Sequence, residues 1–298
     1  MTSENTPEVV NPDIEKIAQI DDPVERAQTA GRMQERLQNE VTELSHIRRE
    51  AIDDLLEQGW KPAHIARELG LTRGRLSKIT ATGAGPERAL ITPRGRVSST
   101  ITLAVVEKVA NERQRSSVVD TTVQAAMKIQ TLAHRWNMDT RTEVVSVGGE
   151  VDLNRDHLIV MIGPRITPLV AQAISADPSI KWKRDEQGHW YMTDTKTGLE
   201  YHSDFDHDSD ESDEERTCYA HMGRIERPDR EGSFLYLGGI HAPGSAGATE
   251  VLCRDIATLW EQARRGLWSC VVKTVASGDR KQILRAEIVT PIYVRNKR

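Results

Sequence analysis

The chain has 298 residues, a net charge of −5 and 38% hydrophobic residues, a composition typical of globular proteins with one large or two ordinary domains. No apolar run approaches the roughly 20 residues that span a bilayer, and the N-terminus lacks the features of an export signal. The three cysteines form no CxxC pair, which argues against a disulfide framework or a structural zinc site. We therefore expect a cytoplasmic protein without membrane contacts, metal or cofactor.

The negative charge is concentrated between Asp204 and Glu215, where eight residues are acidic and none is Lys or Arg. The rest of the chain is mildly basic, at about +3, since −5 plus 8 is +3. A calcium-binding EF-hand loop needs a glycine at its sixth position, which this acidic stretch lacks. The composition favours a solvated acidic loop over 203–216.

Composition shifts divide the chain into four parts. A polar tail over 1–12 precedes a helical domain over 13–81. A linker over 82–96, marked by Gly and Pro, then leads into a mixed α/β domain over 97–298. We therefore expect two folded domains joined by a linker.

The helical domain contains one continuous apolar stripe. Asp21 and Asp22 before Pro23 indicate a helix start. Apolar residues then recur every three or four positions: Val24, Ala27, Ala30, Met33, Leu37, Val41, Leu44 and Ile47. The stripe fits one long helix or two helices broken near Ser45. The same spacing fits a core-packing face or a dimerisation seam, and we expect a homodimer.

The segment from Pro62 to Ile79 has the pattern of a helix-turn-helix unit. Gly70 stands where the turn needs a positive φ, and Thr72 is suited to cap the second helix. A preceding helix from Ile47 to Gln58, ending at Gly59, would complete a three-helix core. Seven positions agree with the pattern: Ile65, Ala66, Leu69, Gly70, Leu71, Leu76 and Ile79.

The outer face of the second helix is the face that enters the major groove in this motif. Arg73 and Lys78 can reach guanine or phosphate, and Ser77 can bond to either. The residues predicted to contact double-stranded DNA are Thr72, Arg73, Gly74, Arg75, Ser77, Lys78, Lys61, His64 and Arg67. A helical hairpin with a glycine turn and no DNA contacts would share part of this pattern.

The second half alternates strands with helices. Strands are expected at 101–109, 143–147, 157–163 and 233–240, and helices at 119–135, 168–175 and 246–264. Hairpins are expected over 180–203, with turns at Gly188 and Gly198, and around 277–279 near the end of the chain. The predicted fold class is therefore a helical domain followed by a Rossmann-like three-layer α/β domain with an antiparallel extension.

Two glycine-containing turns follow buried strands, at 162–168 and 238–247. If those strands are parallel, both turns lie at the carboxyl edge of the sheet, where open α/β sheets bind ligands. Free amides at 244–247 would suit an anion at a helix N-terminus. The residues predicted to bind a small anionic or nucleotide-like effector are Gly163, Arg165, Gly239, His241, Gly244, Ser245 and Gly247. The alternative interpretation is that these glycines only allow tight strand-to-helix turns.

Residues 20–79, from IDDPVERA to RGRLSKI, resemble actinobacterial transcriptional regulators with a sigma-factor-like helix-turn-helix. TGAGPERAL (82–90) is similar to their linker, and the stretches over 152–174 and 234–248 are similar to a C-terminal domain that many of them carry. The resemblance implies a DNA-binding regulator whose second half senses a ligand or self-associates. The acidic insertion at 204–215 departs from that pattern.

No nucleophile elbow or carboxylate pair is recognisable, so we do not expect an enzyme. His241 and Ser245 leave one alternative open, an enzyme or nucleotide-processing effector with an attached DNA-binding module. A nucleoid or phage-type DNA-associated protein with a purely structural second half is the other alternative.

Overall fold

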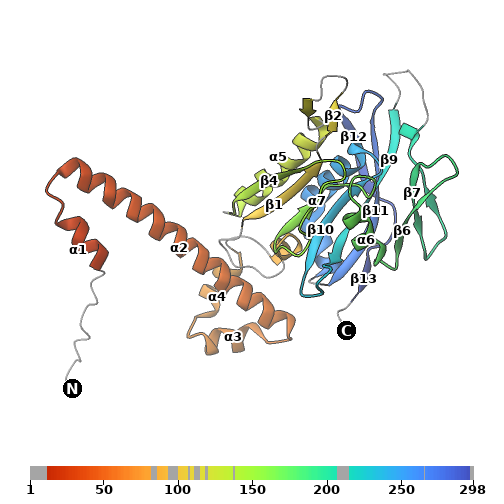
Figure 1. Ribbon diagram of the computed structural model, residues 1–298. Helices are drawn as coiled ribbons and strands as arrows, with labels where there is room; N and C mark the ends of the chain where they lie inside the picture. Colours follow the sequence, from red (N-terminus) through yellow and green to blue (C-terminus); the bar gives the residue numbers. More distant parts are fainter. Residues whose placement is uncertain are drawn as a thin grey trace. The chain divides into compact units, whose positions relative to one another are not determined.

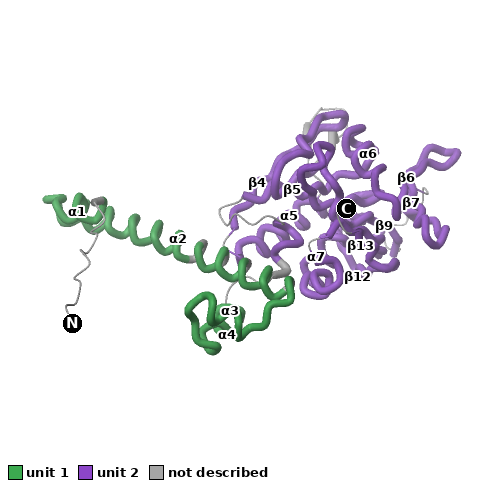
Figure 2. Tube along the Cα trace, turned by 90° about the horizontal axis from the view of Figure 1, so that it is seen from below, with its two compact units in different colours: residues 1–80 green, residues 81–298 purple. Residues whose placement is uncertain are grey.

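The computed structural model describes residues 12–81, 86–92, 100–106, 108–110, 115–117, 120–136, 138–206, 215–264 and 266–295. The chain divides into two compact units, residues 1–80 and residues 81–298 (Figures 1 and 2). Within the described ranges, no helix combines the length and the apolar character that a membrane crossing requires.

The first unit consists of helices α1 (Pro12–Ala18), α2 (Pro23–Glu57), α3 (Pro62–Glu68) and α4 (Arg73–Ala81). The apolar stripe lies on one helix of 35 residues rather than on two. α2 begins where Asp22 accepts a hydrogen bond from the N–H of Val24. The hydroxyl of Ser45 donates back to the carbonyl of Val41 at 2.8 Å, so it is accommodated without breaking the helix.

Glycine ends both α2 and α3 in the same way. Gly59 and Gly70 have φ values of +86° and +62°, the left-handed conformation that costs glycine little. The N–H of Trp60 then donates to the carbonyl of Leu55, and the N–H of Leu71 donates to that of Ala66. This six-to-one bond defines a Schellman motif, which stops each helix and turns the chain back on it.

The second unit contains one main sheet, two small sheets and the helices that cover them. Its first elements are η1 (Pro86–Leu90), β1 (Ile101–Val106), β2 (Lys108–Ala110), β3 (Arg115–Ser117), α5 (Asp120–Arg135), β4 (Thr140–Val145), β5 (Leu158–Val160) and α6 (Pro168–Ser175). They are followed by β6 (Ile180–Arg184), β7 (Trp190–Asp194), β8 (Glu200–Tyr201), η2 (Asp204–Asp206), β9 (Glu215–Glu226), β10 (Ser233–Gly239), α7 (Ala242–Ala263), β11 (Leu267–Ser277), β12 (Ile283–Ile288) and β13 (Tyr293–Arg295).

The main sheet has eight strands in the order β12-β11-β9-β10-β5-β1-β4, with β13 also paired to β11. Strands β4, β1, β5 and β10 are mutually parallel, whereas β9, β11, β12 and β13 pair in antiparallel fashion. The predicted α/β class is thus confirmed, with a mixed sheet.

The two faces of this sheet are covered by different elements. Alternate side chains of β1, β5, β9, β10 and β11 pack against α5, α7 and η1 on one face. The other face packs against α6 and, through a third cluster, against the small sheet β6-β7-β8. This alternation creates three layers, because successive strand residues point to opposite faces.

Three features of the second unit differ from the expectations. β9 lies in the middle of the sheet although no strand was predicted over 215–226, and α7 begins at Ala242 instead of 246. The predicted linker over 82–96 is not a linker throughout, because η1 and the next two residues belong to the α/β unit. Leu90 and Ile91 are 0% and 1% exposed, within the same core as α7.

Candidate functional site

The α3–α4 pair of the first unit is held together by a small apolar core. Ile52 of α2, Ile65 and Ala66 of α3, and Leu76 of α4 are buried together. Leu55, Trp60, Leu71 and Ile79 pack around them. Leu69 is different from its neighbours, because at 40% exposure it caps α3 without entering the core. Six of the seven positions that define the sequence pattern therefore form the core or the turn.

The nine residues predicted to contact DNA are all exposed on this unit: Thr72, Arg73, Gly74, Arg75, Ser77, Lys78, Lys61, His64 and Arg67. Thr72 also caps α4, because its Oγ1 accepts a hydrogen bond from the N–H of Arg75 at 3.2 Å. The cap orients the first turn of α4. Arg73 and Ser77 are one turn apart, so they lie on the same side of the helix.

Glu68 reduces the positive charge on the α3 side of this surface. Its Oε1 lies 3.3 Å from Nη2 of Arg67 and 3.4 Å from Nε2 of His64. The His64 ring is also stacked on Trp60, with 4.5 Å between ring centroids. Exposed pairs of this kind are weak and open readily, but they leave α4 as the stronger cationic element.

A second candidate site lies in the α/β unit, where β5 and β10 end side by side. These neighbouring strands are parallel, so the turns after them share the carboxyl edge of the sheet. The chain then continues into α6 on one face and into α7 on the opposite face. Such a reversal is the position at which open α/β sheets bind ligands. The turns touch, since a Cβ on Gly163 would lie 2.8 Å from the carbonyl oxygen of Gly239.

His241 is the central residue of this edge. It occupies the N-cap position of α7 without a capping hydrogen bond from its side chain, and it is 8% exposed. Its Nε2 lies 2.7 Å from Oδ1 of Asp206, and its Nδ1 lies 3.3 Å from Nη1 of Arg165. Because a guanidinium only donates and a carboxylate only accepts, these contacts select the neutral ring with its proton on Nε2. Burial, and then the charge of Arg165, lowers the pKa of His241 well below its usual value.

Sequence reasoning missed Phe205 and Asp206, which lie beside His241. Phe205 is buried, meets the His241 ring edge-on at 6.1 Å, and lies beneath the guanidinium of Arg280 at 4.9 Å. Asp206 and Phe205 belong to η2, so the predicted solvated loop does not begin at 203. Residues 207–214 of that loop lie outside the described residues. An apolar Phe within an acidic run was the signal that could have revealed this anchor.

The glycine-rich segment after β10 packs as part of α7 rather than as a loop ahead of it. Pro243 to Thr249 are all buried in its first two turns. Gly244 and Gly247 therefore lie inside the helix, and the expected row of free amides over 244–247 is not formed. The hydroxyl of Ser245 turns inward and accepts a hydrogen bond from the N–H of Gly239 at 2.8 Å.

These glycines allow a close approach between α7 and the sheet. A Cβ at Gly244 would lie 2.6 Å from the carbonyl oxygen of Tyr219, and one at Gly247 would lie 2.0 Å from Oγ1 of Thr274. Both distances are too short for non-bonded atoms. Of the seven residues predicted to bind an effector, Arg165 alone is exposed, and its side chain is charged.

Replacing Gly244 with alanine is expected to destabilise the α/β unit by about 1–3 kcal/mol, because the new methyl group would meet a backbone carbonyl that cannot rotate away. Denaturant unfolding followed by tryptophan fluorescence would measure the loss, since five of the six tryptophans lie after residue 81. Gly31→Ala, at a helical glycine with open space around it, is the control and should not destabilise. A Gly244→Ala protein as stable as the wild type would contradict the packing role.

A buried polar network lies on the face of the sheet that α6 covers. Asp177 and His221 are both 0% exposed, and Oδ2 of Asp177 is 3.0 Å from Nε2 of His221. The indole N–H of Trp182 donates to Nδ1 of His221 at 3.3 Å. Burial opposes ionisation of Asp177, but hydrogen bonds from His221 and from the N–H of Ser179 outweigh it and hold the pKa of Asp177 well below its usual value.

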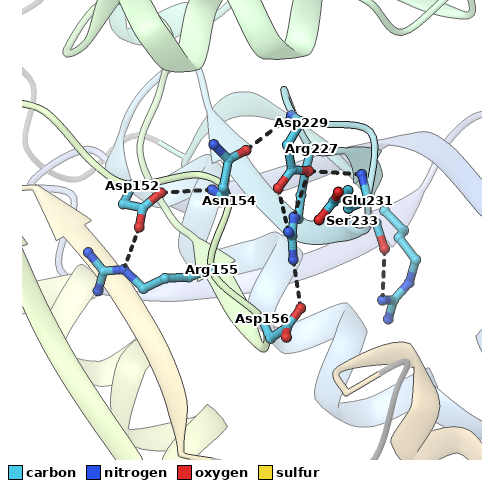
Figure 3. A network of polar contacts seen from close by, with 9 residues as sticks. Asp152, Asn154, Arg155, Asp156, Arg227, Asp229, Glu231 and Ser233 are labelled. Carbon is cyan, nitrogen blue, oxygen red and sulfur yellow. Dashed lines mark hydrogen bonds and ion pairs between the residues drawn. The ribbon is translucent and has the colours of Figure 1, made fainter.

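Another polar network lies at the opposite edge of the sheet, beside the amino ends of β5 and β10 (Figure 3). Arg227 donates to both carboxylate oxygens of Asp229 and, at 2.6 Å, to Asp156. The side-chain oxygen of Asn154 accepts from the N–H of Asp229 at 3.2 Å. These contacts join the loop before β5 to the turn between β9 and β10, which is a structural role.

Comparison with family models, curated proteins and solved structures found no significant match to this chain.

Proposed function

We propose that the chain is a DNA-binding transcriptional regulator in which α3 and α4 form a helix-turn-helix and α4 reads the major groove. The observation that carries this proposal is the division of α4 into two sides. Leu76 is buried and Ile79 packs against the same core, whereas Arg73, Ser77 and Lys78 are exposed. A helix of this kind, crossing a short preceding helix through a glycine turn, suits insertion into the groove.

The α/β unit is proposed to sense a small anionic or nucleotide-like effector or to take part in self-association. Support for sensing comes from the reversal of chain direction beside β5 and β10 and from Arg165, an exposed residue whose guanidinium contacts His241. An anion that binds Arg165 would compete with Nδ1 of His241 for the guanidinium, while Asp206 holds the other ring nitrogen of His241.

The test is binding of the full chain to genomic DNA fragments at two salt concentrations, with Arg73→Ala/Lys78→Ala beside the wild type. The wild type should select particular fragments. The double variant should bind them at least about 30-fold more weakly, because each base contact contributes about 1–3 kcal/mol of discrimination. Weaker binding of the wild type at higher salt would report its phosphate contacts.

The matched control is Lys16→Ala/Arg32→Ala, which removes the same two charges from the same unit but outside α3 and α4. It should retain selective binding. Equal losses in both double variants would mean that net charge alone attracts DNA. A wild-type chain that binds no fragment would refute the proposal.

A further inference from the structure

The first two-thirds of α2 carry apolar side chains that the first unit does not cover. Val41, Leu44 and Ile47 are 55%, 64% and 43% exposed. The short helix α1 packs beside the beginning of α2 (Figures 1 and 2). Between them is a hollow of about 330 Å³, bounded by Ile14 and Ile17 of α1 and by Ala30, Met33, Leu37 and Val41 of α2. An apolar stripe on a surface helix normally faces a packing partner.

From Ala30 to Ile47, the stripe is its own complement when a second copy runs antiparallel to it. If the two-fold axis passes between positions 38 and 39, Leu37 faces Val41 of the other copy. In the same register, Met33 faces Leu44 and Ala30 faces Ile47. Every layer then joins two apolar residues, and the smallest of them meets a large one. Antiparallel helices with this three-and-four spacing pack by inserting side chains of one helix between those of the other.

The charges beside the stripe favour the same orientation. Arg36 and Glu40 lie on one flank of α2, where they form an exposed ion pair at 3.0 Å within the chain, with side chains 69% and 50% exposed. In an antiparallel pair, like flanks face each other, so Arg36 of each copy would meet Glu40 of the other. A parallel pair would instead place this flank against the uncharged flank that carries Gln34 and Gln38.

The size of the surface also fits a second copy. From Pro23 to Ile47, α2 is roughly 37 Å long and roughly 10 Å wide, and the seven residues of α1 add a second helix over roughly 10 Å of that length. Such a face offers roughly 500 Å² per partner, so a pair would bury roughly 1,000 Å², the lower limit for a specific interface. A small molecule could fill the hollow but would leave Leu44 and Ile47 in water.

We propose that the chain forms a homodimer through antiparallel pairing of its α1–α2 hairpins, with Val41 and Leu44 of each copy entering the hollow between α1 and α2 of the other. The dimer carries the two α3–α4 pairs at opposite ends of the paired helices. Two reading helices related by a two-fold axis would match a palindromic DNA site, a consequence that rests on the proposed function.

The first test is the mass of the full chain in solution, by sedimentation equilibrium. The wild type should have twice the 33.4 kDa of one chain. Leu44→Glu should weaken the dimer at least about 100-fold, because two buried leucines are lost per dimer. Leu199→Glu, at a leucine 58% exposed in the other unit, is the matched control and should remain dimeric. A monomeric wild type, or a Leu44→Glu protein that dimerises normally, would refute the proposal.

The second test determines the orientation by disulfide cross-linking in a Cys253→Ser background, since Cys218 and Cys270 are buried. A mixture of Met33→Cys and Leu44→Cys chains should cross-link, whereas neither variant should cross-link alone. Two identical positions would be 11 residues apart along the paired helices, roughly 16 Å, well beyond the ~7 Å that a disulfide can bridge. Efficient cross-linking of Leu44→Cys alone would overturn the antiparallel arrangement. Both tests omit DNA, so their failure is distinct from a failure of DNA binding.

Discussion

Replacing Leu90 and Ile91 together with alanine is expected to unfold the α/β unit or to leave it barely stable. Both side chains are fully enclosed in the core that α5 and α7 share with the main sheet. Truncation of one buried Leu or Ile to Ala costs about 2–5 kcal/mol, and a whole domain has only about 5–15 kcal/mol of stability. The segment before β1 therefore contributes to the folding of the second unit, although its sequence resembles a linker.

Denaturant unfolding of the full chain, followed by tryptophan fluorescence, would measure this effect. Leu199→Ala removes the same side-chain atoms as Leu90→Ala at an exposed turn, and it should change the stability little. A double variant that unfolds at the wild-type denaturant concentration would mean that residues 86–92 do not form part of the core. Any truncated form of the second unit should therefore start no later than Pro86.

Asp177→Ala is expected to destabilise the α/β unit by about 1–3 kcal/mol, the usual cost of leaving a buried hydrogen-bond donor without its acceptor. The reason is that Nε2–H of His221, at 0% exposure, would lose its acceptor and could not reach water. Asp177→Asn keeps an acceptor oxygen beside His221 and should lose less. Equal stabilities of the alanine variant and the wild type would show that water or another group replaces the carboxylate.

The same carboxylate predicts a dependence of stability on pH. The pKa of Asp177 is lower in the folded chain than its ordinary value of 3.8, so the folded state favours the ionised form. Its contribution to the free energy of unfolding is complete above about pH 4, declines as the pH falls below that value, and is fully lost only at the lower pKa of the folded state. The stability difference between wild type and Asp177→Asn should therefore narrow in unfolding curves measured from pH 6 down to pH 3.

Local features of this protein follow from residues only a few positions apart, and the sequence by itself determined them. Pro168–Ser175 forms the predicted helix, and Asp22 and Thr72 cap the helices that their positions indicated. Gly70 has the positive φ that the turn between α3 and α4 needs. Caps, turns and the spacing of apolar residues depend on the backbone of one element, which its own side chains control.

The central position of β9 and the burial of η1 were decided only by the tertiary structure. In β9, apolar residues stand at every second position at Cys218, Ala220 and Met222, as in a strand with one face in the core. Arg216, His221 and Arg224 in the same segment obscure this pattern in the sequence. Arg224 is tolerated at 1% exposure because its Nη2 donates to the carbonyl of Ala89 at 2.8 Å, a residue 135 positions away. No window of sequence contains both partners, so the strand looked too polar for a sheet interior.

The site around His241 also combines features that the sequence indicated with features that only the tertiary structure decided. The sequence indicated that Arg165 and His241 would meet, because parallel strands bring their carboxyl ends to one edge. It did not indicate Asp206, which belongs to an acidic run, nor the packing of Gly244 and Gly247 against β9 and β11. These features arise where segments far apart in the sequence come close in space. How closely they approach is set by the packing of the layers and not by any local preference of the chain.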